Sequence, residues 1–230
     1  MANKTILALC VAMALLAGCK KQADDVAGAP VAEPAAQAGS DTPVTEPVEA
    51  PAETASATPA VTVFDINGIA VSDKPLPAWP YIALPAGYRY YRAEDMASQS
   101  KDLARVPVWT GGQLLWVEGK TFSDAIRSDD GKTYSKFEVR KNLQQAVEAL
   151  GGVRLGERSY DEATYKANEK ALDDFRREFD RIRDAYWYDA DADTYLIRRA
   201  DKAIWVVFQT NNDGGGLLVA EGPLPEPPAK

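Results

Sequence analysis

The chain has 230 residues, with 26 Lys and Arg against 34 Asp and Glu, two cysteines and no histidine. The absence of histidine excludes Ser-His-Asp and Cys-His catalysis and most zinc sites. The acidic balance, without a basic patch, argues against nucleic acid as a partner.

The first 18 residues have the layout of a secretory signal peptide. Lys4 precedes an apolar run over residues 5–17, and small residues follow it. The run is shorter than the ~20 apolar residues that a bilayer-spanning helix requires. We therefore expect residues 1–18 to be a cleaved export signal.

The end of this stretch, Leu16-Ala17-Gly18-Cys19, resembles the lipobox of bacterial lipoproteins. The resemblance implies that the chain is cut before Cys19 and that the Cys19 thiol carries the membrane lipid. Lys20, rather than Asp, follows Cys19, which in that family is typical of the outer membrane, with the rest of the chain facing the periplasm. With Cys10 removed in the signal peptide, a disulfide has no partner. The alternative is a signal peptide with an incidental cysteine.

A lipidated Cys19 and a disordered tether are expected over residues 19–60. Residues 22–60 hold seven acids, no base and no aromatic residue. Such a composition cannot bury enough apolar surface to offset the chain entropy. All Trp, Tyr and Phe residues lie within 61–222, where we expect one folded domain, and residues 223–230 return to a Pro-rich tail.

The first part of this domain is expected to be extended. Residues 75–92 contain four prolines and therefore cannot form a regular helix. They are expected to lay their aromatic residues on the domain. Residues 113–127 have the pattern of a strand interrupted at Gly119 by a bulge or a hairpin, and Asp130-Gly131 predicts a turn.

Two helices are expected next. Ser135-Lys136-Phe137-Glu138 fits a capping box, so the first helix begins there and ends at Gly151-Gly152. The second is expected over residues 160–186, because its apolar residues recur three or four apart after a box-like start at Ser159.

Short strands are expected over residues 153–155, 194–199, 203–209 and 217–220. The glycines at 214–216 favour a hairpin turn with positive φ rather than a phosphate-binding loop. Runs of strands separated by two helices predict an α+β fold, with a mostly antiparallel sheet and two main helices.

Four stretches of the domain resemble the N-terminal periplasmic region of OmpA-family proteins from Gram-negative bacteria. They are WPYIALPAGYR, VPVWTGGQLLWVEGKTFS, EVRKNLQQAVEALGGVRL and TYLIRRADKAIWVVFQTNNDGGGLLVAE. In that family a peptidoglycan-binding domain follows. Its Asn-x-x-Leu-Ser-x-x-Arg stretch does not occur in this sequence, so its cell-wall ligand cannot be assigned to any residue here.

Two motifs suggest chemistry and are incomplete. Asp189-Ala190-Asp191-Ala192-Asp193 resembles the opening of a calcium loop but lacks the later Gly and Glu that such a loop requires. Ser98 and Lys101 fit the Ser-x-x-Lys pattern of penicillin-interacting enzymes, without its Lys-Thr-Gly partner. We expect no catalytic residue, metal or cofactor. The alternative is a serine hydrolase acting on cell-wall or β-lactam-like substrates through Ser98 and Lys101.

One group of aromatic and basic residues is predicted to form a binding surface, namely Trp79, Tyr81, Tyr88, Arg89, Tyr90, Tyr91 and Arg92. Aromatic planes beside arginines stack sugars or anchor protein interfaces. The alternative is that these rings only pin an irregular segment onto the sheet. The expected function is that of a non-enzymatic outer-membrane lipoprotein, whose domain binds an envelope protein or peptidoglycan.

Overall fold

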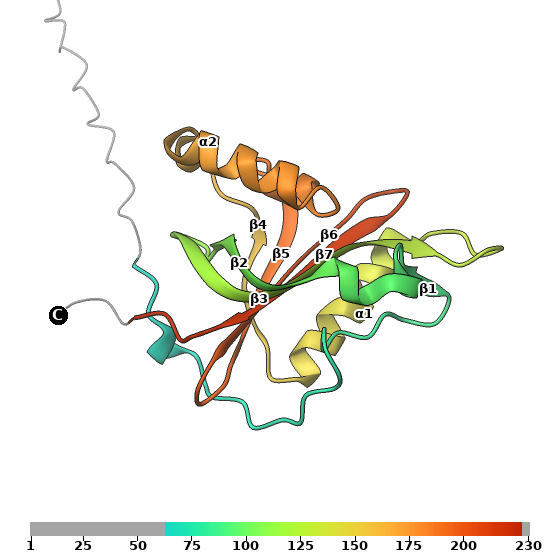
Figure 1. The fold of residues 1–230 in the computed structure, drawn as a ribbon, viewed down its shortest axis with the longest axis horizontal. Coiled ribbons are helices and arrows are strands. Elements are labelled where there is room, and N and C mark those ends of the chain that lie inside the picture. The colour runs from blue at the N-terminus through green and yellow to red at the C-terminus, as the bar shows by residue number, and fades with distance from the viewer. Residues whose placement is uncertain (1–62, 227–230) are drawn as a thin grey trace, which may run out of the picture. The chain divides into compact units, whose positions relative to one another are not determined.

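A seven-stranded antiparallel sheet runs through the part of the chain that the computed structural model describes, residues 63–226 (Figure 1). Its strands are β1 (Tyr88–Tyr90), β2 (Ser100–Trp109), β3 (Leu114–Ser128), β4 (Val153–Arg158), β5 (Asp191–Arg198), β6 (Ala203–Thr210) and β7 (Gly215–Gly222). They are ordered β1-β3-β7-β6-β5-β4, and β2 pairs with the same edge of β3 as β1.

The described residues also contain two α-helices and three 3-10 helices. They are α1 (Lys136–Ala149), α2 (Glu162–Glu178), η1 (Ile66–Gly68), η2 (Ala93–Gln99) and η3 (Arg183–Tyr186). The predicted α+β fold, with a mostly antiparallel sheet and two main helices, is confirmed. The predicted signal peptide, Cys19, the tether and residues 227–230 of the tail lie outside the described residues.

The two helices cover opposite faces of the sheet (Figure 1). Along β6 the side chains alternate between two cores. Ile204, Val206 and Phe208 pack on the α1 side, whereas Trp205 and Val207 pack on the α2 side. Burial on both faces explains why β6 and β7 are almost continuous apolar runs over their central residues, since no alternate position there faces water.

α1 begins at the predicted capping box, with a tyrosine inserted into it. Ser135 is the N-cap, and its Oγ accepts a hydrogen bond from the Glu138 amide at 3.2 Å. The Tyr88 hydroxyl accepts from the Ser135 amide at 3.1 Å and donates to Glu138 Oε2 at 2.8 Å. Tyr88 therefore joins β1 to the first turn of α1.

α2 begins later and ends earlier than predicted. Its N-cap is Asp161, not Ser159, and the Asp161 carboxylate accepts from the Thr164 amide at 2.7 Å. The helix ends at Glu178, so residues 160–186 are not one helix. The apolar periodicity continues past the break because the residues beyond it still pack into the α2-side core. These residues are Phe179, Ile182 and Tyr186.

β3 runs unbroken through Gly119, where a break was expected. The irregularity lies in the neighbouring β2, whose register on β3 shifts between Lys101 and Ala104. A Cβ on Gly119 would lie 1.9 Å from the Glu221 carbonyl oxygen, so β7 approaches the β3 backbone closely there. The glycine is required for this approach between strands.

The expected extended segment is present. The sequence pattern does not predict β1, which lies within this segment, or β2, which follows it. β2 contains Pro107 and pairs with β3 alone. Proline is tolerated in a strand at a sheet edge, because there its missing N–H is not needed for pairing. A proline-containing run at an edge therefore looks like a loop in the sequence.

Between β1 and β2, the edge of β3 has no paired strand, and a buried carboxylate bonds to backbone amides there. Residues 91–99 leave the sheet, and Asp124 of β3 stands opposite the gap with no exposed surface. Its Oδ2 accepts from the Arg92 amide at 2.7 Å, and its Oδ1 accepts from the Ala125 amide at 2.8 Å. Asp124 thus replaces the missing strand partner and fixes the backbone that carries Arg92.

Replacing Gly119 with Ala is expected to destabilise the fold by about 3 kcal/mol, because the added Cβ overlaps backbone atoms of β7. Urea denaturation measures the loss. Gly131→Ala is the matched control, since Gly131 has φ +83° but open space around its Cβ position. Gly131→Ala should lower the free energy of unfolding by only about 1 kcal/mol, because alanine is strained in the left-handed backbone conformation. Equal losses in the two variants would contradict the close approach.

Asp124→Ala is expected to destabilise the fold by about 2 kcal/mol near neutral pH, because two backbone amides lose their acceptor. Burial raises the pKa of Asp124 above its ordinary 3.8, so the folded protein keeps this proton to higher pH than the unfolded chain. Wild type therefore loses stability relative to the variant as the pH rises from about 4. Urea denaturation at about pH 4 and pH 7 should show a smaller difference at pH 7, and a larger one would refute the raised pKa.

Candidate functional site

The predicted aromatic surface is divided between the core and the exterior. Tyr88 and Tyr90 are only 6% and 8% exposed and pack in the α1-side core, so these two residues were wrongly placed on a surface. The alternation of β1 turns both rings inward and Arg89, between them, outward. Tyr91 is 41% exposed, and Arg92 is exposed beside it.

Trp79 and Tyr81 are partly buried against the same core. Trp79 Nε1 donates to Ser100 Oγ at 2.9 Å, and the Tyr81 hydroxyl donates to Glu221 Oε2 at 2.6 Å. These two rings attach the extended segment to the strands. The outward residues Arg89, Tyr91 and Arg92 are the part of the predicted surface that remains open to a ligand.

Next to these residues, three arginines from two separate segments line one polar pocket of about 230 Å³. Arg127 comes from the end of β3, whereas Arg181 and Arg183 come from the segment after α2. Gln209, near the end of β6, and Asn211, just after it, line the same pocket. We call this the arginine pocket. The Arg181 guanidinium lies 4.7 Å from the centre of the Tyr91 ring, which connects the pocket to the predicted surface.

Glycines at the start of β7 make room for these arginines. A Cβ on Gly214 would lie 1.9 Å from Arg127 Nη1, and a Cβ on Gly216 would lie 2.5 Å from the Arg181 carbonyl oxygen. Neither glycine has positive φ, which corrects the prediction of a turn that requires it. Gly216 is instead needed because the backbone at Arg181 lies directly on the hairpin, whereas a side chain at Gly214 would displace only the end of the Arg127 side chain.

The charges of the arginine pocket are incompletely balanced. Arg181 and Arg183 each have a neighbouring aspartate, with the nearest nitrogen and oxygen atoms 3.7 Å apart. No carboxylate of residues 63–226 forms an ion pair with Arg127. Arg127 also stands directly across from Arg89 in the β1–β3 register, where like charges are unfavourable, and Arg89 itself has Asp129 at 3.6 Å as a partial counter-charge. An anion bound beside Arg127 would relieve this repulsion.

A second pocket of about 440 Å³ adjoins the first, and Asp180, Arg183 and Asp184 line both. Trp187 is 47% exposed and forms one side of it. The guanidinium of Arg176 lies 3.6 Å from the centre of the indole ring. We call this the tryptophan pocket, and the two pockets together the groove.

Arg176 holds the indole in place. Its side chain is 10% exposed, forms an ion pair with Asp173 and donates to the Tyr186 carbonyl oxygen at 3.2 Å. Cationic groups stacked on a tryptophan face are attracted to its π electrons. Trp187 is therefore a half-exposed aromatic surface with a largely buried guanidinium stacked on its ring.

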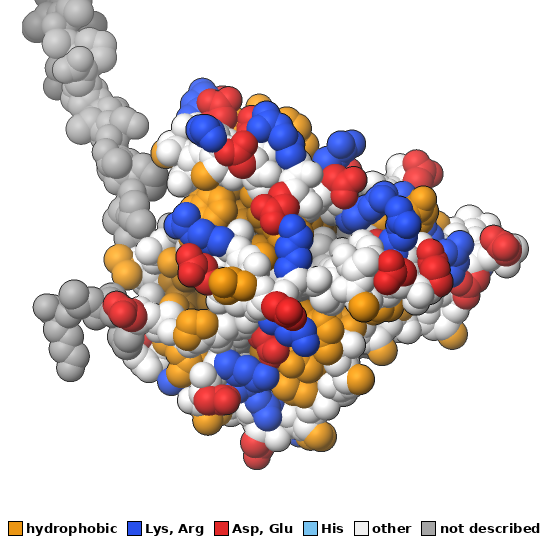
Figure 2. Space-filling model, viewed as in Figure 1, with side chains coloured by type: hydrophobic (Ala, Val, Ile, Leu, Met, Phe, Trp, Pro, Cys, Tyr) orange, Lys and Arg blue, Asp and Glu red, His pale blue; other side chains and the backbone are white. Residues whose placement is uncertain are grey.

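Figure 2 shows how the charges are distributed around these pockets. Lys and Arg side chains gather beyond the C-terminal end of α2 and over the tip of the β6–β7 hairpin, with Asp and Glu side chains among them. The groove thus combines positive and negative groups on one face of the molecule. The sequence prediction missed Arg127, Arg181, Arg183 and Trp187.

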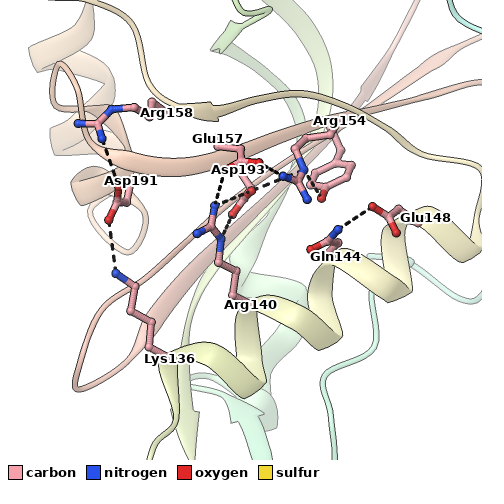
Figure 3. Close-up of polar contacts among 10 residues, drawn as sticks. Lys136, Arg140, Gln144, Glu148, Arg154, Glu157, Arg158, Asp191 and Asp193 are labelled. Carbon is pink, nitrogen blue, oxygen red and sulfur yellow. Dashed lines mark hydrogen bonds and ion pairs between the residues drawn. The ribbon is translucent and has the colours of Figure 1, made fainter.

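Another cluster of charges joins α1 to β4 and β5 (Figure 3). In contrast to the arginine pocket, its arginines bond to partners within the fold. Arg140 donates to the buried carboxylate of Asp193 at 2.6 and 3.1 Å, and these bonds raise the pKa of Arg140. Arg154 donates to the Tyr195 hydroxyl at 2.9 Å and pairs with Glu157. Because both arginines have internal partners, this cluster stabilises the packing of α1 on the sheet.

The aspartates that resemble a calcium loop lie partly in this cluster. Asp191 pairs with Lys136 and Arg158, and Asp193 pairs with Arg140, so basic side chains occupy both carboxylates. Within residues 63–226, no group of His, Cys, Asp and Glu is arranged to hold a metal ion.

Ser98 and Lys101 are each bonded to other groups. The Ser98 hydroxyl donates to the Asp95 carbonyl oxygen at 3.0 Å. The Lys101 ammonium group pairs with Glu178 of α2 and lies 4.9 Å from the Phe179 ring centre. Lys101 therefore stabilises the end of α2, and the bonding of both residues gives no support to a serine–lysine pair.

Comparison of the chain with protein-family models, with curated proteins and with solved structures yields no match. None of the helices formed by residues 63–226 is long and apolar enough to span a membrane. The groove and the N-terminal sequence are therefore the grounds on which a function can be proposed.

Proposed function

We propose that this chain is an outer-membrane lipoprotein whose periplasmic domain is a non-catalytic binding module that takes an anionic ligand in the groove. The observation that carries the proposal is Arg127, a guanidinium that lines a polar pocket with Arg181 and Arg183 and has no carboxylate partner in the described part of the chain. Its five N–H donors are suited to a carboxylate or phosphate.

Two further features support this assignment. The three arginines are presented by β3 and by the segment packed on β7, so they are placed by the sheet rather than by a free loop. The lipobox-like Leu16-Ala17-Gly18-Cys19 supports a lipid anchor at Cys19. An acyl-bearing cysteine would hold the domain at a membrane surface, where several acyl chains together give firm attachment.

Cys19→Ser is expected to abolish incorporation of labelled palmitate and to move the protein from the outer-membrane fraction to the soluble fraction. Cys10→Ser is the matched control and should remain labelled, because Cys10 lies in the segment that the proposal removes. Metabolic labelling followed by density-gradient fractionation measures both effects. Labelling that persists in Cys19→Ser would refute the anchor.

The double variant Arg127→Ala/Arg181→Ala is expected to bind citrate and inorganic phosphate at least ~10-fold more weakly than wild type, equivalent to about 1.4 kcal/mol. Calorimetric titration measures both affinities. Arg105→Ala is the control, because Arg105 is equally cationic, exposed and stacked on Trp116 away from the groove. Equal affinities in wild type and the double variant would refute the anion site.

A further inference from the structure

We propose that the ligand of the groove is an acidic oligosaccharide, with its acid group in the arginine pocket and a sugar ring against Trp187. This inference rests on the proposed anion site and extends it along the groove. It follows from the composition of the tryptophan pocket, which the anion site alone does not explain.

The first step is the aromatic surface. Trp187 is half exposed, and Arg176 fixes its ring from one side. A flat apolar face that is held in place before binding contributes contact area at little cost in side-chain entropy. The apolar C–H face of a pyranose ring matches such a surface in size and flatness.

The second step is the alternation of charge along the segment that both pockets share. Asp180 and Asp184 flank Arg181 and Arg183, and the pairs lie at 3.7 Å rather than in short hydrogen bonds. Carboxylates accept hydrogen bonds from hydroxyl groups, and guanidinium groups donate to them. A ligand with many hydroxyl groups can therefore bond to both kinds of side chain at once.

The third step is the limited positive charge. Five arginines and three aspartates line the two pockets, and the whole chain has a net charge of −8. Nucleic acids bind through many phosphate contacts, each of which needs a basic partner. The interspersed carboxylates disfavour such a polyanion and suit a ligand with about one acid group in the arginine pocket.

The size of the tryptophan pocket also agrees with a small organic ligand. Its volume of about 440 Å³ lies within the common range for small-molecule sites, about 300–1,000 Å³. The adjoining arginine pocket is polar and smaller, at about 230 Å³. A chain of sugar rings that passes from one to the other would place neutral and acidic parts in separate pockets.

The test is calorimetric titration of the full-length protein with trigalacturonate and with its neutral methyl ester, which keeps the sugar rings and replaces each carboxylate by an uncharged ester. A hyaluronan tetrasaccharide, inorganic phosphate and hexathymidylate are the further probes. Wild type should bind at least one of the two acidic saccharides, and the methyl ester at least ~10-fold more weakly than trigalacturonate. Hexathymidylate should bind more weakly than the acidic saccharide.

Trp187→Ala should weaken saccharide binding by about tenfold and leave phosphate binding unchanged. Trp187→Phe should retain most of the affinity, which separates loss of the aromatic face from misfolding. Phe137→Ala is the matched control, since Phe137 is 74% exposed on α1, outside the groove. Arg127→Ala/Arg181→Ala should weaken binding of the acidic saccharide and of phosphate alike.

The outcomes separate the two proposals. If phosphate binds through Arg127 and Arg181 but neither acidic saccharide binds, the saccharide inference is wrong and the anion site stands. If Trp187→Ala binds the saccharide as tightly as wild type, or hexathymidylate binds best, the inference is likewise overturned. If none of the anions binds, both proposals fail.

Discussion

The fold depends on the burial of β5, β6 and β7 on both faces. Because each successive side chain of β6 enters one core or the other, these strands have little surface on which to carry charged groups. The polar residues are displaced to strand ends and to the segments that follow the helices. Arg127 at the end of β3 and Asn211 after β6 occupy such positions, and both line the proposed site. The location of the groove is thus a consequence of how the core is built.

The groove is held together by close backbone contacts rather than by ion pairs. Gly214 and Gly216 allow Arg127 and the chain at Arg181 to lie on the β6–β7 hairpin, where any side chain would displace them. This brings cationic groups together, and the neighbouring aspartates of Arg89, Arg181 and Arg183 offset their charges only in part, at 3.6 to 3.7 Å. A folded protein tolerates an unfavourable local arrangement when the rest of the structure fixes it, and such arrangements are found at functional sites. The repulsion therefore favours an anion as the proposed ligand.

The parts of the fold that depend on local signals could be predicted from the sequence. The start of α1 at Ser135 follows from four adjacent residues, and the central strands follow from their apolar composition. The groove could not be predicted in the same way. Arg89 and Arg127 become neighbours only through the β1–β3 register, 38 residues apart in sequence. The run of glycines at 214–216 is visible in the sequence. The sequence does not show, however, which distant segment packs into the space that a glycine leaves free. Residues 179–184 were assigned to a helix because their apolar neighbours keep a helical spacing after α2 has ended.

The two arginine clusters show how the same residue type serves stability in one place and is proposed to serve recognition in another. Arg140 donates two hydrogen bonds, of 2.6 and 3.1 Å, to the buried carboxylate of Asp193, so two of its donors are used within the fold. Removing one member of such a pair leaves the other without a partner, which makes the pair structurally necessary. Arg127 is exposed at an open polar pocket and forms no ion pair with any carboxylate of residues 63–226. A ligand acid group would therefore displace water from Arg127 without first breaking an internal ion pair, whereas at Arg140 it would have to compete with Asp193. That difference in competition, rather than the number of arginines, is the reason for proposing the groove as the binding site.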